Sequence, residues 1–158
     1  METPSNIYSK YCNDFQNAPL GAYVIAKFTE YFYKNSKTDR KVNIIHIFAI
    51  VPMILNSNYR SCIGKKTIIH ALIKSINENK LTFGSYQDMI DKYKEYSMCS
   101  LIFALRLGLV QLDRDNILLK TNKLPNYHSN LIEASEQLGK LFANADLFSF
   151  LSFVGVHL

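Results

Sequence analysis

The sequence has 158 residues, of which 48% are hydrophobic and 20% are charged, and both fractions are typical of one globular domain. A chain of this length buries roughly 70% of the surface that its unfolded form exposes, so its stability requires no disulfide, metal or cofactor. The 18 basic and 13 acidic residues give a net charge of +5. This charge is compatible with an anionic partner but is lower than that of a dedicated nucleic-acid-binding protein.

Cysteine usage and the apolar segments predict the compartment. Cys12, Cys62 and Cys99 are odd in number and widely spaced, which indicates neither a disulfide framework nor a zinc ribbon. The first residues lack the basic and apolar regions of a secretory signal. The apolar run Val42–Leu55 falls short of the roughly 20 residues needed to cross a bilayer. We therefore expect a cytoplasmic protein without membrane contact.

Residues 17–56 are predicted to form an N-terminal pair of helices. Asn17 and Pro19 suit a helix N-terminus, and apolar side chains then recur at helical spacing, at Leu20, Val24, Phe28 and Tyr31. A polar and basic connection, residues 36–41, leads to the second helix, Val42–Leu55. We expect the two helices to pack antiparallel.

Residues 66–120 are predicted to form three helices and a β-hairpin, preceded by a turn-rich loop over residues 56–66. The first helix carries an apolar face, made by Ile68, Ile69, Leu72, Ile73 and Ile76. A capping-box pattern starts the second at Ser85, and the third spans Ser97–Leu107. Two short apolar runs, Leu109–Leu112 and Ile117–Lys120, flank turn residues 113–116 and predict the hairpin. Three helices followed by a hairpin are typical of a winged-helix-like unit.

Residues 129–158 are predicted to form a C-terminal helical segment, after a polar connection over residues 121–129. Its last residues hold more apolar side chains than one face of a short helix buries. They belong either to the core or to a partner interface, and the interface candidates are Phe148, Phe150, Leu151, Phe153, Val154 and Val156. The predicted fold is thus one mainly α domain over residues 1–158.

Motifs for catalysis or metal binding are not recognisable in the sequence. The histidines His46, His70, His128 and His157 have no metal-ligand spacing, and we interpret His46 and His70 as core or boundary residues. Gly64–Thr67 matches only the end of a phosphate-binding loop. We therefore predict no catalytic, cofactor or metal site, and a protein that is not an enzyme.

Contact with DNA is possible through the loops. The predicted third helix has Arg106 as its only charged residue, so it lacks the side chains that pair with base edges. Basic residues lie instead in loops and around the hairpin, where they could contact the DNA backbone, at Lys37, Arg40, Lys41, Arg60, Lys65, Lys66 and Arg114. An ordinary solvated surface is the alternative for these residues.

Several blocks of the sequence together resemble a known family. They are Asn17–Tyr23, Phe48–Leu55, Phe103–Leu112, Leu138–Ala143 and Val154–Val156. In their order and spacing, these blocks are similar to the middle component of the ABC-three-component systems, which are bacterial defence operons that include Lamassu-type systems.

This resemblance implies a role in an assembly. Such middle components accompany an SMC-like ABC ATPase and an effector subunit that is often a nuclease. The first hypothesis is therefore a non-catalytic adaptor subunit that couples these partners in defence against phages or plasmids, with DNA near its basic loops. The alternative is a free-standing winged-helix transcription regulator that binds DNA alone.

Overall fold

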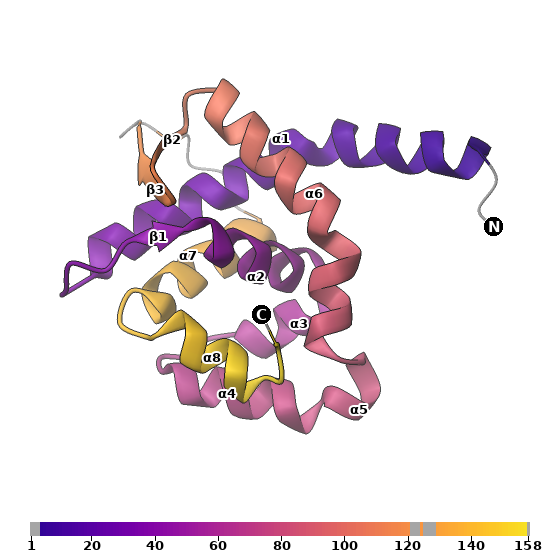
Figure 1. Cartoon of the computed structure of the whole chain (residues 1–158). Helices are drawn as coiled ribbons and strands as arrows, with labels where there is room; N and C mark the ends of the chain where they lie inside the picture. Colours follow the sequence, from indigo (N-terminus) through magenta and orange to yellow (C-terminus); the bar gives the residue numbers. More distant parts are fainter. Residues whose placement is uncertain (1–3, 121–123, 125–128, 158) are drawn as a thin grey trace.

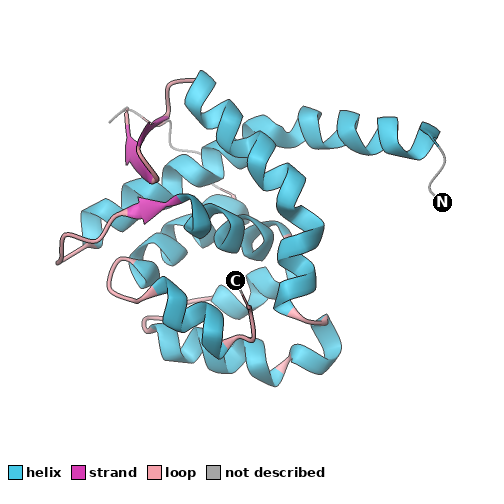
Figure 2. Cartoon of the chain, in the orientation of Figure 1, coloured by secondary structure: helices cyan, strands magenta, loops and turns pink. Residues whose placement is uncertain are grey.

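The protein is mainly helical, with a small antiparallel sheet at one end (Figures 1 and 2). The computed structural model describes residues 4–120, 124 and 129–157, and it describes side chains from residue 17 onward within these ranges. The polar connection predicted over residues 121–129, His128 and the side chain of Cys12 therefore lie largely or wholly outside the described part. The predicted mainly helical domain with a hairpin is confirmed.

The elements follow one another with short connections. The first part of the chain contains α1 (Pro4–Asn35), β1 (Val42–Asn43), α2 (Ile44–Leu55), α3 (Ser57–Ile63), α4 (Ile69–Glu78) and α5 (Lys80–Phe83). The second part contains α6 (Tyr86–Arg106), β2 (Val110–Asp113), β3 (Asn116–Leu119), α7 (Asn130–Phe142) and α8 (Leu147–Phe153).

Helix α1 is the central element of the fold. Its second half packs against α6 on one side and α7 on the other, while its N-terminal part extends past α6 in Figure 1. Two glycines allow these close approaches. A Cβ atom on Gly139 would lie 2.7 Å from the Phe28 carbonyl oxygen, and one on Gly21 would overlap the side chain of Ser100. Because backbone atoms of α1 lie against Gly139 and the short side chain of Ser100 lies against Gly21, neither position has room for a side chain.

An aromatic cluster joins the first and last helices in the core. The rings of Phe32 and His46 are 5.5 Å apart, those of His46 and Phe142 are 6.1 Å apart, and those of Phe142 and Phe150 are 4.9 Å apart. These side chains come from α1, α2, α7 and α8 in turn, and all are buried. The C-terminal helix is therefore held by the same core as α1.

The strands described by the structure form one antiparallel sheet in the order β1-β3-β2. Val42 pairs with Ile117 in β3, and Val110 in β2 pairs with Leu119. The sheet is attached to α1 because the Tyr33 hydroxyl donates a 2.8 Å hydrogen bond to the Ile117 carbonyl. The predicted hairpin is present with its boundaries shifted by one residue. The strand at Val42 was predicted as the start of a helix.

The helix predicted over Ser97–Leu107 is not a separate element. It is the second half of α6, which runs without a break from Tyr86 to Arg106. No glycine or proline interrupts this stretch, and the side chains of Ser97 and Ser100 are fully buried at the crossing with α1. Ser100 is small enough to lie against Gly21 of α1, so this part of the helix is fixed by the crossing rather than by a new start.

The turn-rich segment predicted as a loop over residues 56–66 contains helix α3. The Asn56 side chain accepts hydrogen bonds from the backbone N–H groups of Asn58 and Tyr59, which caps the helix. Tyr59 and Ile63 are then buried. Local turn propensity was overridden here by a cap and by burial. The unpredicted α5 and the start of α1 at Pro4 rather than Asn17 are further differences.

The last predicted segment, residues 129–158, consists of two helices rather than one. Helix α7 ends at Phe142 and α8 begins at Leu147, where the Asp146 side chain accepts a hydrogen bond from the Ser149 backbone N–H at 2.8 Å. This cap starts a new helix direction. None of the described helices combines the length and apolar character needed to cross a membrane.

The close approach of α7 to α1 predicts the effect of a single methyl group. In Gly139→Ala, the added Cβ would meet backbone atoms of Phe28 and Phe32, which cannot move without shifting α1. We expect the free energy of unfolding to fall by about 2 kcal/mol, measured by urea denaturation. Glu133→Ala on the exposed face of α7 is the control and should change stability much less. Equal stability of the two variants would contradict this packing.

Candidate docking surfaces

Histidine side chains are the first candidates for acid–base or metal chemistry in this chain. His46 is buried, whereas His70 and His157 are exposed. Among the residues that the structure describes, no three His, Cys, Asp or Glu side chains come together in a way that could hold a metal ion. These histidines therefore do not combine into a metal site within the described chain.

His46 takes part in the start of helix α2. Its Nδ1 accepts a hydrogen bond from the Asn43 backbone N–H at 3.1 Å, and the Asn43 side chain accepts one from the His46 N–H at 3.1 Å. This is a capping box in which the histidine occupies the position usually held by Glu or Gln. Burial disfavours the imidazolium and lowers the pKa of His46 to about 4, although nearby Asp146 opposes the shift.

The predicted basic residues fall into two groups. Lys37, Arg40 and Lys41 are exposed in the connection between α1 and β1, and Arg114 is exposed in the hairpin turn. The backbone N–H of Ile44 donates to the Asp115 carbonyl at 3.2 Å, so the turn lies beside the start of α2. The antiparallel pairing therefore places Arg114 and the basic connection at opposite ends of the two-residue strand β1, although they are far apart in the sequence. Three acidic residues accompany them, at Asp39, Asp113 and Asp115.

The second basic group lies between α3 and α7. Arg60 is half-buried, and its Nη1 donates to the Ile54 carbonyl at 2.7 Å and to the Leu55 carbonyl at 3.3 Å. Its guanidinium therefore caps the C-terminus of α2. Lys65 is exposed, and the Lys66 carbonyl accepts a hydrogen bond from the Gln137 side chain. Arg60 and Lys65 line a cavity of about 560 Å³ that Glu133 and Glu136 also line.

The apolar tail divides between core and surface. Four of its predicted interface residues are almost completely buried, namely Phe150, Leu151, Val154 and Val156. Phe148 and Phe153, in contrast, are 53% and 61% exposed on α8. The expected interface is therefore reduced to these two phenylalanines, because the other four side chains fill the protein's own core.

The two exposed phenylalanines each border a cavity. Phe153 lines a cavity of about 310 Å³ between α8 and α4, together with Ile69 and Ile73. Phe148 lines a smaller cavity beside Arg40 and Lys41. Exposed aromatic rings that border surface cavities are the kind of surface that protein partners cover.

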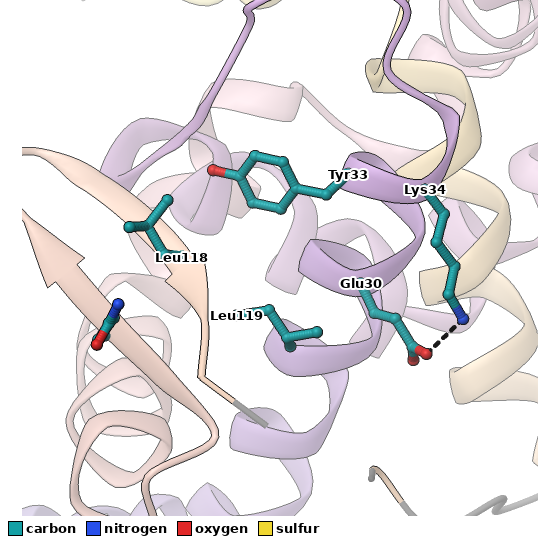
Figure 3. A pocket seen from close by; sticks show the side chains of 6 residues that line it. Glu30, Tyr33, Lys34, Leu118 and Leu119 are labelled. Atoms are coloured by element: carbon teal, nitrogen blue, oxygen red, sulfur yellow. Dashed lines mark hydrogen bonds and ion pairs between the residues drawn. The ribbon is translucent and has the colours of Figure 1, made fainter. Parts of the chain in front are cut away.

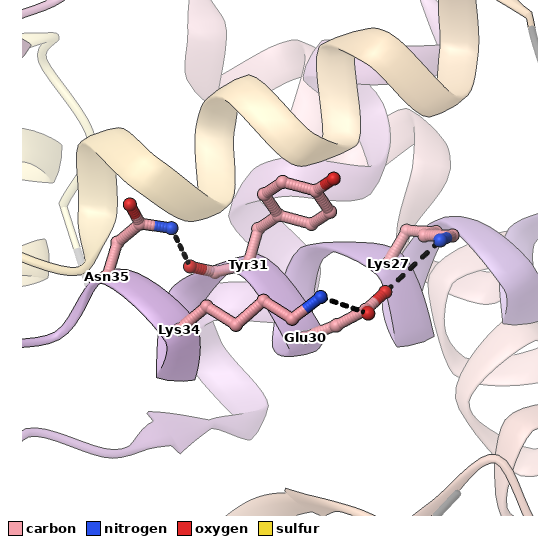
Figure 4. A network of polar contacts seen from close by, with 5 residues as sticks. All are labelled: Lys27, Glu30, Tyr31, Lys34 and Asn35. Atoms are coloured by element: carbon pink, nitrogen blue, oxygen red, sulfur yellow. Dashed lines mark hydrogen bonds and ion pairs between the residues drawn. The ribbon is translucent and has the colours of Figure 1, made fainter. Parts of the chain in front are cut away.

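A polar network on α1 was missed from the sequence (Figure 4). Glu30 accepts from the Lys27 ammonium at 3.1 Å and from the Lys34 ammonium at 2.6 Å. Burial acts to raise the pKa of Glu30, but the hydrogen bonds from Lys34 and Lys27 lower it below its ordinary value. The spacing of these residues, three and four apart, is the signal that could have indicated the network. No pattern in the sequence indicates that the Lys27 side chain is buried.

Comparison with known proteins identifies the family. The family model of the ABC-three component (ABC-3C) system Middle Component 3 matches residues 5–158. The chain belongs to the Middle Component 3 family. A search of curated proteins and a search of solved structures each found no match. As a middle component of a multi-component system, the Middle Component 3 chain has partner subunits.

The buried neutral His46 predicts a dependence of stability on pH. Its folded pKa of about 4 lies below the ordinary value of 6.5, so the unfolded chain takes up a proton first as the pH falls. Stability is thus fully present above pH 6.5, falls between 6.5 and 4, and levels off below 4. We expect a loss of about 2 kcal/mol between pH 7 and pH 5, measured by urea denaturation.

Two variants separate this effect from other titrations. His46→Gln can still accept at the capping box but does not titrate, so much of the pH dependence should disappear. His70→Gln removes an exposed histidine on α4 and should leave the dependence unchanged. A wild-type stability that is flat between pH 7 and pH 5 would rule out a neutral buried imidazole.

Proposed function

We propose that this Middle Component 3 chain is a non-catalytic, cytoplasmic adaptor in a bacterial system that acts against phages or plasmids. Its partners would be an SMC-like ABC ATPase and an effector nuclease, as in Lamassu-type systems. The match over residues 5–158 supports the assembly role. The resemblance of the sequence blocks supports the choice of partners. In this proposal, ATP hydrolysis and DNA cleavage occur in the partner subunits.

The observation that carries the adaptor role is the exposure of Phe148 and Phe153 on α8. Leaving a large aromatic side chain in water costs stabilisation that burial would provide, about 25 cal/mol per Å² of apolar area. The cavity beside Phe153, lined by Ile69 and Ile73 on α4, provides apolar surface that a partner side chain could fill. We assign the exposed surface of α8, which carries both rings, together with its border to α4 as the main docking surface for another subunit, and we name it the α4–α8 face.

DNA contact is a secondary part of the proposal. Only the two-residue strand β1 separates the turn that holds Arg114 from the connection that holds Arg40 and Lys41, so the sheet end of the molecule could meet a DNA backbone at both places. Asp39, Asp113 and Asp115 reduce the positive charge there. Contact should therefore be weak, independent of sequence, and useful only when a partner also holds the DNA.

The alternative of a free-standing winged-helix regulator is less well supported. Its strand order and hairpin would suit such a fold, with α6 as the helix that enters the groove. The exposed side of α6, however, carries three acidic residues, Asp88, Asp91 and Glu95. These repel phosphates and balance the three basic residues of the same helix, Lys92, Lys94 and Arg106, so α6 carries no net positive charge. Sequence-selective binding by the chain alone would favour this alternative.

The docking surface is tested by replacing both exposed phenylalanines. In Phe148→Ser/Phe153→Ser, affinity for the co-expressed ATPase or effector should fall at least tenfold, because central aromatic residues carry much of the binding energy. Co-elution in size-exclusion chromatography and titration calorimetry would measure the loss. Stability should change by less than about 1 kcal/mol, since both rings are largely exposed.

The matched control replaces two other exposed apolar residues, Leu81 and Leu107, with serine. This variant should bind the partners normally. A wild-type chain that is folded but co-elutes with neither protein would remove the adaptor proposal. If the Phe148→Ser/Phe153→Ser variant binds the partners normally, the docking surface lies elsewhere on the chain.

The DNA contact is tested at the hairpin turn. Arg114 has a backbone φ of 56°, a conformation that favours glycine, so Arg114→Gly removes one charge without straining the turn. In the assembled complex, this variant should bind a short duplex more weakly, with the salt slope reduced by about one, whatever the DNA sequence. Lys74→Ala on α4 is the control. Unchanged retention in gel shifts would exclude the contact.

A further inference from the structure

A second groove lies between α1 and the β2–β3 hairpin (Figure 3). It encloses about 610 Å³, and its lining includes Tyr33, Leu118 and Leu119. Glu30 and Lys34 from α1 and Gln111 from β2 complete the lining that the structure describes. The groove thus combines apolar walls with a charged rim, and it is lined by different residues from the α4–α8 face.

We propose that this groove binds an extended segment of a partner subunit in which an acidic residue lies next to an apolar one. The apolar side chain fits against Leu118, Leu119 and the ring of Tyr33. The acidic side chain reaches the Lys34 ammonium. The identification of the partner as another subunit rests on the proposed function, whereas the chemistry of the segment rests on the groove itself.

The charges on the rim favour an acidic partner. Glu30 divides its two carboxylate oxygens between Lys27 and Lys34. Glu136 also acts on Lys34, and the Lys140 ammonium lies over the same Tyr31 ring as Lys34, so three lysines share two carboxylates. The Lys27 side chain is only 4% exposed and is committed to this contact, while the Lys34 side chain is 59% exposed. Lys34 can turn towards a second carboxylate at little cost, because an exposed ion pair contributes little, and Glu30 keeps Lys27.

The strand at the border of the groove favours an extended segment. The order β1-β3-β2 places β2 at the edge of the described sheet. The Lys120 N–H donates to the Leu109 carbonyl at 3.0 Å, so the alternation of an antiparallel ladder makes Gln111 and Leu118 the next hydrogen-bonded pair. The N–H and C=O of Leu112 then point outward. An extended chain can pair with such an edge while its side chains enter a neighbouring groove.

The test is a selection of random twelve-residue peptides, displayed on phage, against the full-length chain. Enriched peptides should share an acidic residue within two positions of an apolar one. Synthetic copies would then be titrated by fluorescence anisotropy. Affinity should fall roughly tenfold for Lys34→Glu, because an attraction is replaced by a repulsion, and as strongly for Leu118→Asp.

Two controls separate binding from folding. Lys74→Glu alters an exposed lysine that is paired four residues away with Glu78, as Lys34 is with Glu30, and should bind the peptides normally. Peptides in which lysine replaces the acidic residue should regain affinity for Lys34→Glu, which an unfolded variant could not show. Absence of enrichment, or full affinity for both groove variants, would overturn the proposal.

The failure of the groove proposal can be distinguished from the failure of the adaptor proposal. The Phe148→Ser/Phe153→Ser variant should bind the selected peptides with wild-type affinity, since it leaves the groove intact. If the complex forms while no peptide is enriched, the groove proposal fails alone. If peptides bind the groove while the chain joins no partner protein, the adaptor proposal fails alone.

Discussion

The fold depends on the burial of the second half of α1 between α6 and α7. Two glycines set this arrangement, because Gly21 meets the side chain of Ser100 and Gly139 meets the backbone around Phe28. With α1 fixed at both contacts, Phe28 and Phe32 lie in the aromatic cluster that also holds the C-terminal helix. The positions of the hairpin and of α8 follow from this packing rather than from direct contact with each other.

The same packing explains why the two candidate surfaces are separate. The α4–α8 face is held by the core through Phe150, which touches Phe142. The groove is held through Tyr33, whose hydroxyl bonds to the Ile117 carbonyl. One surface offers aromatic side chains, and the other offers aliphatic walls with a rim that carries Glu30 and Lys34. A subunit that joins two partners needs such a pair of chemically distinct surfaces so that neither partner competes for the site of the other.

Much of the fold could be predicted from periodicity, whereas the surfaces could not. Regular spacing of apolar residues located α4 and α7, and turn residues located the hairpin. The residues of α6 were also predicted to be helical, but as two helices rather than one. Pairing of Val42 with Ile117 joins segments about 75 positions apart, and no local pattern indicates it. The sequence also does not indicate which residues of the tail are buried, because Phe148 and Phe150 are the same residue type two positions apart. Only the packing of α8 shows which ring is in the core.

The candidate sites reveal a similar limit. The sequence indicated which residues are basic, but Arg60 is used to cap α2, and Lys27 is buried beside Glu30. The sequence alone does not indicate whether a charged side chain contacts solvent, a helix end or an opposite charge. Family resemblance, by contrast, is carried by apolar and glycine blocks, which is why it was recognisable before the surfaces were known.

The short strand β1 links parts of the molecule that otherwise stand apart. It connects the hairpin to the first turn of α2, where the Ile44 N–H bonds to the Asp115 carbonyl and Asn43 begins the capping box. A subunit that pulled on the hairpin would therefore strain the start of α2 and, through His46, the aromatic cluster. Mechanical load applied at one end of the molecule would reach the helix that carries Phe148 without any large rearrangement of the chain.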